Sequence, residues 1–464
     1  MGLLEANPIF LLIVALVICV FFYFGIEKMR RGRSLDADMF DIRKDLKNIK
    51  GQGQKRLEEE PKEILLGTDL NGGKISVPID THHMYCSGTT GTGKTVLLSN
   101  IIKASIDYGC PLAGIDGKGD TGPGSMVEII RGMKGDKKLY VIDMNNPETS
   151  DKYNPFKNTS PTVVKDMLIN LTEWSEEHYK ANTERYLQCL IELMFKLSIP
   201  LSLESIVHSM PVDDFLVLSK RANQEGVISK TDHVRNMEVA KTSGKIAQDA
   251  MARFSTLIEG EMGALFAPDG VDIITAIREN AIILFVLNPL LYPELSPKIG
   301  NLAVIDSKKA VSHLYKKKQG RVFYLFDEIN VYCSNAFLDL VNKSRSADVT
   351  CFLASQTLSD LDAFSVHFRN QIIENCNSYV VLRQNTTENA EGWAKIIGTR
   401  PTMDVTYQLK MEDRTTTDTG MGSARKTREF YFHPDYIKSL PKGKGVYINK
   451  DTGYKSAIDV NKPF

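Results

Sequence analysis

The chain has 464 residues, a length that allows more than one domain. Of these residues, 42% are hydrophobic and 25% are charged, a composition that excludes a disordered protein. Lysine plus arginine and aspartate plus glutamate both number 57, so the net charge of zero gives no global sign of nucleic-acid binding. A DNA contact would have to come from a local patch or an assembled pore. Seven cysteines without a C-x-x-C pair predict free thiols in a reducing compartment.

The N-terminal region contains one apolar run of the length that crosses a bilayer. Pro8 to Ile26 carries no charge over 19 residues, and four basic residues follow between positions 28 and 33. The positive-inside rule then predicts a single-pass anchor in the inner (cytoplasmic) membrane, with the bulk of the chain in the cytoplasm. A cleaved signal peptide is the alternative, but its basic n-region and cleavage site are missing. We predict the anchor with its basic flank at 1–33 and a charged linker at 34–62.

Residues 63–157 are predicted to form the first part of a nucleotide-binding domain. The sequence CSGTTGTGKT fits G-x-x-x-x-G-K-[ST], the phosphate loop of P-loop NTPases, between a short apolar strand and a helix. Lys94 is expected to reach the β and γ phosphates as a catalytic residue, and the Thr95 hydroxyl to ligate Mg²⁺. The predicted ATP-binding residues are Gly88, Thr89, Thr90, Gly91, Thr92, Gly93, Lys94 and Thr95.

The next apolar runs predict a mainly parallel sheet. Residues 111–116 and 139–143 are expected to be buried strands joined by crossover connections. Ligands bind at the carboxyl ends of such strands. Asp116, Lys118 and Asp120 are therefore expected near the nucleotide or a neighbouring subunit, unless they form a plain polar loop.

Residues 158–266 show a different pattern. Apolar residues recur at helical spacing and strand signals are scarce, which predicts an all-α inserted domain. Trp174, Tyr179 and Tyr186 lie in it. They either stack on bases or, the more common role for such residues, pack in a core.

The second part of the nucleotide-binding domain is predicted at residues 267–464. The apolar strand 322–326 ends in Asp327 and Glu328, which is the form of a Walker B site. Asp327 is expected to hold Mg²⁺ together with Thr95. Glu328 is expected to polarise the attacking water as a general base.

Three polar residues further along complete the predicted site. Gln356 follows the strand 349–354, where its amide can act as a γ-phosphate sensor, with a plain polar strand end as the alternative. Arg345 is the predicted catalytic arginine acting across a subunit boundary, and Arg383 is the second candidate. Residues 398–428 are rich in Thr, Gly and Asp and are predicted to be a mobile loop. A closing stretch through residue 448 is predicted to end the sheet.

The order of these motifs resembles that of a known family. IDGKGD, YNPF, YLFDEIN, FLASQT and HPDYIKSLPKGKGVYI follow the phosphate loop in that order. The chain is similar in this respect to the coupling-protein ATPases of type IV secretion and conjugation. These are the TraD/TraG type, within the FtsK/HerA group of DNA pumps. The similarity extends from residue 64 to residue 450.

The resemblance implies a RecA-like α/β body with a membrane-distal all-α domain, assembled as a membrane-anchored homo-hexamer. It implies ATP and Mg²⁺ as cofactors, and DNA, relaxase or relaxosome proteins and type IV secretion channel components as partners. The implied function is to recruit a relaxase–DNA complex and to drive DNA transfer through the channel with ATP. Family members commonly have two membrane helices, whereas this sequence shows one apolar run of that length.

Two other functions are compatible with the same motifs. One is a substrate adaptor at the channel that uses ATP as an assembly switch without pumping. The other is a different translocase of the FtsK/HerA group.

Overall fold

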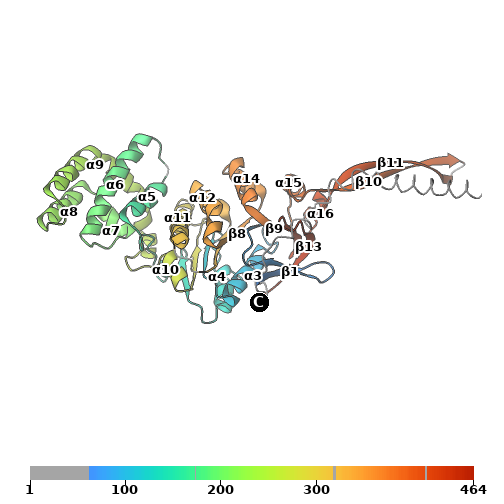
Figure 1. Ribbon diagram of the computed structural model, residues 1–464, viewed down its shortest axis with the longest axis horizontal. Helices are drawn as coiled ribbons and strands as arrows, with labels where there is room; N and C mark the ends of the chain where they lie inside the picture. The colour runs from blue at the N-terminus through green and yellow to red at the C-terminus, as the bar shows by residue number, and fades with distance from the viewer. Residues whose placement is uncertain (1–61, 173, 317–319, 413–414) are drawn as a thin grey trace, which may run out of the picture. The chain divides into compact units, whose positions relative to one another are not determined.

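The computed structural model describes residues 62–172, 174–316, 320–412 and 415–464, with the backbone alone between 407 and 423. The predicted anchor and the predicted linker up to residue 61 lie outside the described residues. Within the described ranges, no helix combines the length and the apolar character that a bilayer crossing requires. The chain from residue 62 onward is one compact unit (Figure 1).

One large sheet organises this unit. Eleven strands of the described chain lie in the order β2-β1-β13-β12-β9-β3-β8-β7-β4-β6-β5. The strands from β9 to β5 pair in parallel, and the other four pair antiparallel, which confirms the predicted α/β fold with a mainly parallel sheet. The strands are β1 (Glu63–Thr68), β2 (Lys74–Pro78), β3 (His83–Ser87), β4 (Leu112–Asp116), β5 (Leu139–Asp143), β6 (Ile282–Val286), β7 (Val322–Asp327), β8 (Val349–Ser355), β9 (Cys376–Leu382), β12 (Lys444–Asn449) and β13 (Lys455–Val460).

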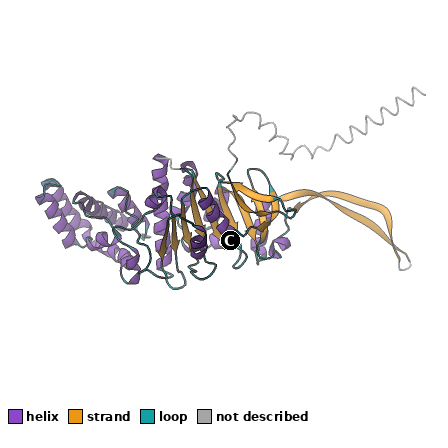
Figure 2. Ribbon diagram, turned by 90° about the horizontal axis from the view of Figure 1, so that it is seen from below, coloured by secondary structure: helices purple, strands orange, loops and turns teal. Residues whose placement is uncertain are grey.

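Helices cover both faces of the sheet because its central strands are apolar on both sides. In β6, Leu284 belongs to the core under α3 and α4, whereas Ile283 and Phe285 belong to the core on the opposite face. Figure 2 shows helices on both sides of the strands. The helices packed on the sheet are α3 (Lys94–Asp107), α4 (Met126–Met133), α10 (Ile273–Arg278), α11 (Leu295–Lys316), α12 (Asn335–Ser344), α13 (Leu358–Asp362), α14 (Val366–Asn375) and α15 (Thr387–Ile397); α16 (Pro434–Lys438) follows them.

The chain between β5 and α10 contains helices and no named strand among its described residues. They are α5 (Pro161–Asn170), α6 (Glu177–Lys196), α7 (Leu203–His208), α8 (Val212–Gln224), α9 (Lys230–Ile258) and the short η2 (Glu261–Leu265). Tyr186 is fully buried, with its ring 4.8 Å from that of Phe215, so it packs in the core of these helices. Trp174 is partly buried, and Tyr179 is exposed.

A buried ionic cluster lies where these helices join the sheet. The Lys309 ammonium of α11 is 2.8 Å from Asp306 Oδ1 and 3.0 Å from Asp272 Oδ2, and all three side chains are almost completely buried. The Tyr153 hydroxyl donates to Asp306 at 3.1 Å. Tyr153 precedes the inserted helices and Asp272 follows them, so this cluster ties both ends of the insertion to α11.

The structure corrects two expectations near the C-terminus. Residues 398–428 are not a mobile loop: β10 (Thr399–Glu412) and β11 (Thr415–Phe430) pair as a two-stranded antiparallel ribbon that extends from the central sheet (Figure 2). In the sequence, apolar and polar residues alternate from Met403 to Glu412, a period of two that predicts a strand and outweighs the loop-like composition. Nor does the sheet end near residue 448, because β13 inserts between β12 and β1.

The buried cluster predicts a large stability loss when its cation is removed. Lys309→Met leaves two buried carboxylates without their cation, so we expect the free energy of unfolding to fall by about 3–5 kcal/mol. Lys308→Met is the matched control, because Lys308 makes only an exposed ion pair with Asp339 and its loss should cost less than about 1 kcal/mol. Chemical unfolding of both variants measures the difference. Equal losses would contradict a structural role for the cluster.

Candidate nucleotide-binding site

The phosphate loop lies between β3 and α3, at the carboxyl end of the parallel strands. Gly91 and Gly93 have φ angles of 76° and 117°, a region that favours glycine, so other residues would be strained there. Inside the loop, the Thr92 hydroxyl donates to the Thr89 carbonyl at 2.6 Å. The Thr89 N–H donates to the carbonyl of Arg383, just beyond β9, at 3.2 Å. The loop is therefore shaped both by its own side chains and by the neighbouring strand.

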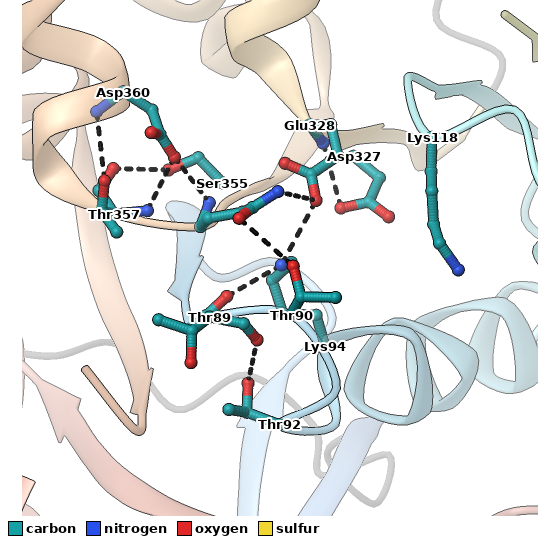
Figure 3. Close-up of polar contacts among 12 residues, drawn as sticks. Thr89, Thr90, Thr92, Lys94, Lys118, Asp327, Glu328, Ser355, Thr357 and Asp360 are labelled. Carbon is teal, nitrogen blue, oxygen red and sulfur yellow. Dashed lines mark hydrogen bonds and ion pairs between the residues drawn. The ribbon is translucent and has the colours of Figure 1, made fainter. Parts of the chain in front are cut away.

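Lys94, the first residue of α3, is held in a buried ion pair. Its ammonium is 2.8 Å from the Gly88 carbonyl oxygen and 3.3 Å from Glu328 Oε1. The two charged side chains are 8% and 10% exposed. Figure 3 shows Lys94 between the phosphate loop and the Walker B carboxylates. Because the ammonium already faces the loop, an anionic phosphate bound there would compete with Glu328 for it.

Asp327 ends β7 and Glu328 follows it, as expected from the sequence. Burial, with the charges of Asp116 and Glu328, raises the pKa of Asp327 to about 7. Asp116 is the register partner of Asp327 on β4, and burial raises its pKa to about 6. A cation beside these carboxyls would favour their charged forms.

Glu328 has a backbone conformation that is rare for a residue with a side chain. Its φ of 48° and ψ of 53° lie in the left-handed region, and such strain is concentrated at functional sites. Its N–H donates to Asp327 Oδ1 at 3.0 Å. Its Oε2 is buried without a hydrogen-bond partner in the described part of the chain. That carboxylate oxygen therefore has the capacity to accept a proton or a hydrogen bond from a water.

Gln356 joins the phosphate loop to the Walker B strand. Its Nε2 donates to Glu328 Oε1 at 3.3 Å, and its Oε1 accepts from the Thr90 hydroxyl at 3.3 Å. Asp360 fixes the backbone here by accepting from the N–H groups of Gln356 and Thr357 at 3.1 and 2.8 Å. One amide thus contacts both a loop residue and the expected general base.

The other predicted site residues are Arg345, Arg383 and Thr95. Arg345 is exposed and precedes β8, at the end of that strand opposite Gln356, so the structure does not bring it to Lys94 of its own chain. Arg383 lies beside Thr89, and its Nε is buried without a hydrogen-bond partner in the described residues. Thr95 follows Lys94 in the first turn of α3 and is partly buried.

Asp116, Lys118 and Asp120 differ in their burial. Asp116 is buried and is the register partner of Asp327 on the neighbouring strand. Lys118 instead pairs with Asp120 at 2.8 Å, and both side chains are largely exposed.

Sequence reasoning missed two residues that shape the site. Asp360 caps α13 in a capping box with Thr357, and the T-x-x-D spacing is a sequence signal for it. Gln384 is fully buried behind the phosphate loop. Only the strand order, with β9 beside β3, reveals its place.

The residues fit ATP with Mg²⁺. A Cβ built at Gly91 would meet nothing within 4 Å, so the space beside this residue is open to an approaching phosphate. Lys94 supplies a buried cation for phosphate oxygens, and Asp327 supplies a carboxylate for the metal. The unpartnered Oε2 of Glu328 supplies an acceptor for the attacking water.

Comparisons with known proteins give matches to coupling proteins of conjugation. Residues 321–442 match the family model described as the TraM recognition site of TraD and TraG, which includes the Walker B strand and Gln356. The plasmid coupling protein TrwB in complex with the ATP analogue ADPNP is 15% identical with a TM-score of 0.59, covering 88% of this chain and 91% of that one. The resemblance to TraD/TraG-type coupling proteins is confirmed.

Two further structures are similar in fold to this chain. TrwB in complex with ADP and Mg²⁺ is 13% identical with a TM-score of 0.57, covering 88% of this chain and 90% of that one. VirB4 of Thermoanaerobacter pseudethanolicus is 13% identical with a TM-score of 0.52, covering 88% of this chain and 98% of that one. At these identities the likeness establishes the fold. A search of curated protein sequences gives no match.

The raised pKa of Asp327 predicts a pH-dependent stability gain in Asp327→Asn. The folded pKa of Asp327 is above its ordinary value of 3.8, so its protonated carboxyl contributes stability to the folded chain at low pH. This contribution is lost as the pH rises through about 7. Asparagine carries no such cost. Without nucleotide, we expect Asp327→Asn to raise the free energy of unfolding relative to the unmodified chain, by roughly 2 kcal/mol more at pH 8 than at pH 5.

Urea unfolding at the two pH values checks this expectation. Asp107→Asn is the control, because Asp107 is exposed and paired with Lys103, so its replacement should give no gain that grows with pH. If the effect of Asp327→Asn on the free energy of unfolding did not depend on pH, the raised pKa of Asp327 would be contradicted.

Proposed function

We propose that this chain is a membrane-anchored ATPase that recruits a relaxase–DNA complex and drives DNA transfer through a type IV secretion or conjugation channel. One observation carries the proposal. Three residues from separate parts of the sequence meet at one edge of the sheet, namely Lys94, Glu328 and Gln356. The fold of the chain is similar to that of the coupling protein TrwB. These residues form the site for ATP hydrolysis.

The chemistry follows from the contacts of the chain. Thr95 and Asp327 are the residues that would hold Mg²⁺, which when bound supplies positive charge to the phosphate oxygens. Lys94 exchanges Glu328 for phosphate oxygens, and this exchange frees the carboxylate. Glu328 then orients the attacking water and accepts its proton. Gln356 reports the change because it contacts Thr90 and Glu328 at the same time.

The comparisons support the cofactors and the partners. Structures of TrwB hold ADP with Mg²⁺ and an ATP analogue, which supports ATP and Mg²⁺ for this chain. The matched family model, named for TraM recognition, supports relaxosome-type partners. DNA and components of the channel are the further partners that this function requires.

The anchor, the location and the assembly are part of the same proposal. Residues 8–26 supply the span that holds the chain at the inner membrane, with the ATPase body in the cytoplasm. The body assembles as a homo-hexamer. The exposed position of Arg345, away from Lys94 of its own chain, supports a role in the site of a neighbouring subunit.

ATPase assays on the full chain test the proposal. We expect hydrolysis that DNA stimulates and that rises cooperatively with protein concentration. Lys94→Ala should abolish it by removing the phosphate contact. Glu328→Gln should keep ATP binding but lower kcat by about 10²–10⁴-fold, because the general base is lost.

Lys103→Ala is the matched control, since Lys103 is an exposed lysine on the same helix, paired with Asp107. Its activity should equal that of the unmodified chain. Hydrolysis that ignores both DNA and protein concentration would contradict a ring-forming DNA motor. DNA transfer in cells that survives Glu328→Gln would favour the non-pumping adaptor instead.

A further inference from the structure

Gln384 is a buried amide that lies directly after β9 and behind the phosphate loop. Its side chain is fully buried, and its Nε2 is 3.2 Å from Ser87 Oγ and 3.4 Å from the backbone carbonyl oxygen of Gln356. The carbonyl oxygens of Leu382 and Arg383 are also within 3.5 Å. Carbonyl oxygens only accept hydrogen bonds, so the amide nitrogen of Gln384 has to face them.

These contacts join the ends of three neighbouring strands. Ser87 ends β3, and its hydroxyl donates to the Gln356 carbonyl at 3.3 Å. The N–H of Gly88 donates to the carbonyl of Ser355, the last residue of β8, at 3.3 Å. Gln384 adds the end of β9 to this junction. Ser87 and Gln384 therefore both donate to the carbonyl oxygen of Gln356.

The position of this backbone decides what the Gln356 side chain reaches. Its amide contacts Thr90 and Glu328 at 3.3 Å each, distances at the long end of a hydrogen bond. A shift of a few tenths of an ångström would break one of the two contacts. We propose that Gln384 is a positioning residue that holds Gln356 in contact with both the phosphate loop and the general base. The inference rests on the proposed ATP hydrolysis.

A stability role alone does not explain an amide at this position. Gln384 Oε1 is buried and has no hydrogen-bond partner in the described residues, so half of the amide is desolvated without compensation. An apolar side chain of similar size would avoid that cost. The amide nitrogen and its contacts are what the glutamine supplies to the site.

The test combines kinetics with a double-mutant cycle in the full chain. Gln384→Leu should lower kcat for ATP about tenfold, leave KM within about twofold, and leave the melting temperature unchanged or higher. In a Gln356→Ala background, the same change should lower kcat by less than about twofold, because the residue it positions is gone. Ser87→Ala, which removes the junction from β3 with little change in volume, should reproduce the kcat effect if Gln384→Leu folds poorly.

Ser378→Ala removes a fully buried hydroxyl from the opposite end of β9 and should leave kcat unchanged. An equal kcat loss from Gln384→Leu with and without Gln356 would overturn the inference, as would a change in KM alone. A full chain that hydrolyses no ATP would instead defeat the proposed function, so the two failures are distinguishable.

Discussion

Lys94 and Glu328 form an ion pair of 3.3 Å in a site where both side chains are almost completely buried. A buried cation and carboxylate each need a partner, because leaving either one alone costs several kcal/mol. In the nucleotide-free chain each group has the other as its partner, and ATP binding would separate them. The phosphates would take the lysine, and the released carboxylate would face water. In the proposed mechanism, nucleotide binding is thereby coupled to the activation of the base, and Gln356 shares Glu328 as a partner.

The sheet makes this coupling possible by placing β3, β8, β7 and β4 side by side, with all four strands ending at one edge. The phosphate loop, Gln356, Asp327 and Asp116 then meet although they are far apart in the sequence. The inserted helices depend on a second buried group of charges. Lys309 is held by Asp306 and Asp272 where the insertion meets α11. This cluster ties both ends of the insertion to α11.

Much of the site follows from the sequence because its motifs have recognisable forms. Lys94 was predicted from the phosphate-loop motif, and Asp327, Glu328 and Gln356 from their places at the ends of apolar strands. The structure brings these residues together. The ribbon β10–β11 was missed because its Thr, Gly and Asp content resembles that of a loop, although its alternation is that of a strand. Gln384 could not be found from the sequence, since its role depends on β9 lying beside β3. Arg345 is exposed and lies away from Lys94 of its own chain, and its predicted role across a subunit boundary involves a second subunit, which no feature of one chain specifies.

The central claim is that ATP takes Lys94 from Glu328. A structure of the full chain with Mg²⁺ and a non-hydrolysable ATP analogue tests it most directly. We predict the Lys94 ammonium on the phosphate oxygens, Mg²⁺ at Thr95 and Asp327, and a water at Glu328 in place of the lysine. A bound nucleotide with the Lys94–Glu328 pair still intact would contradict this account.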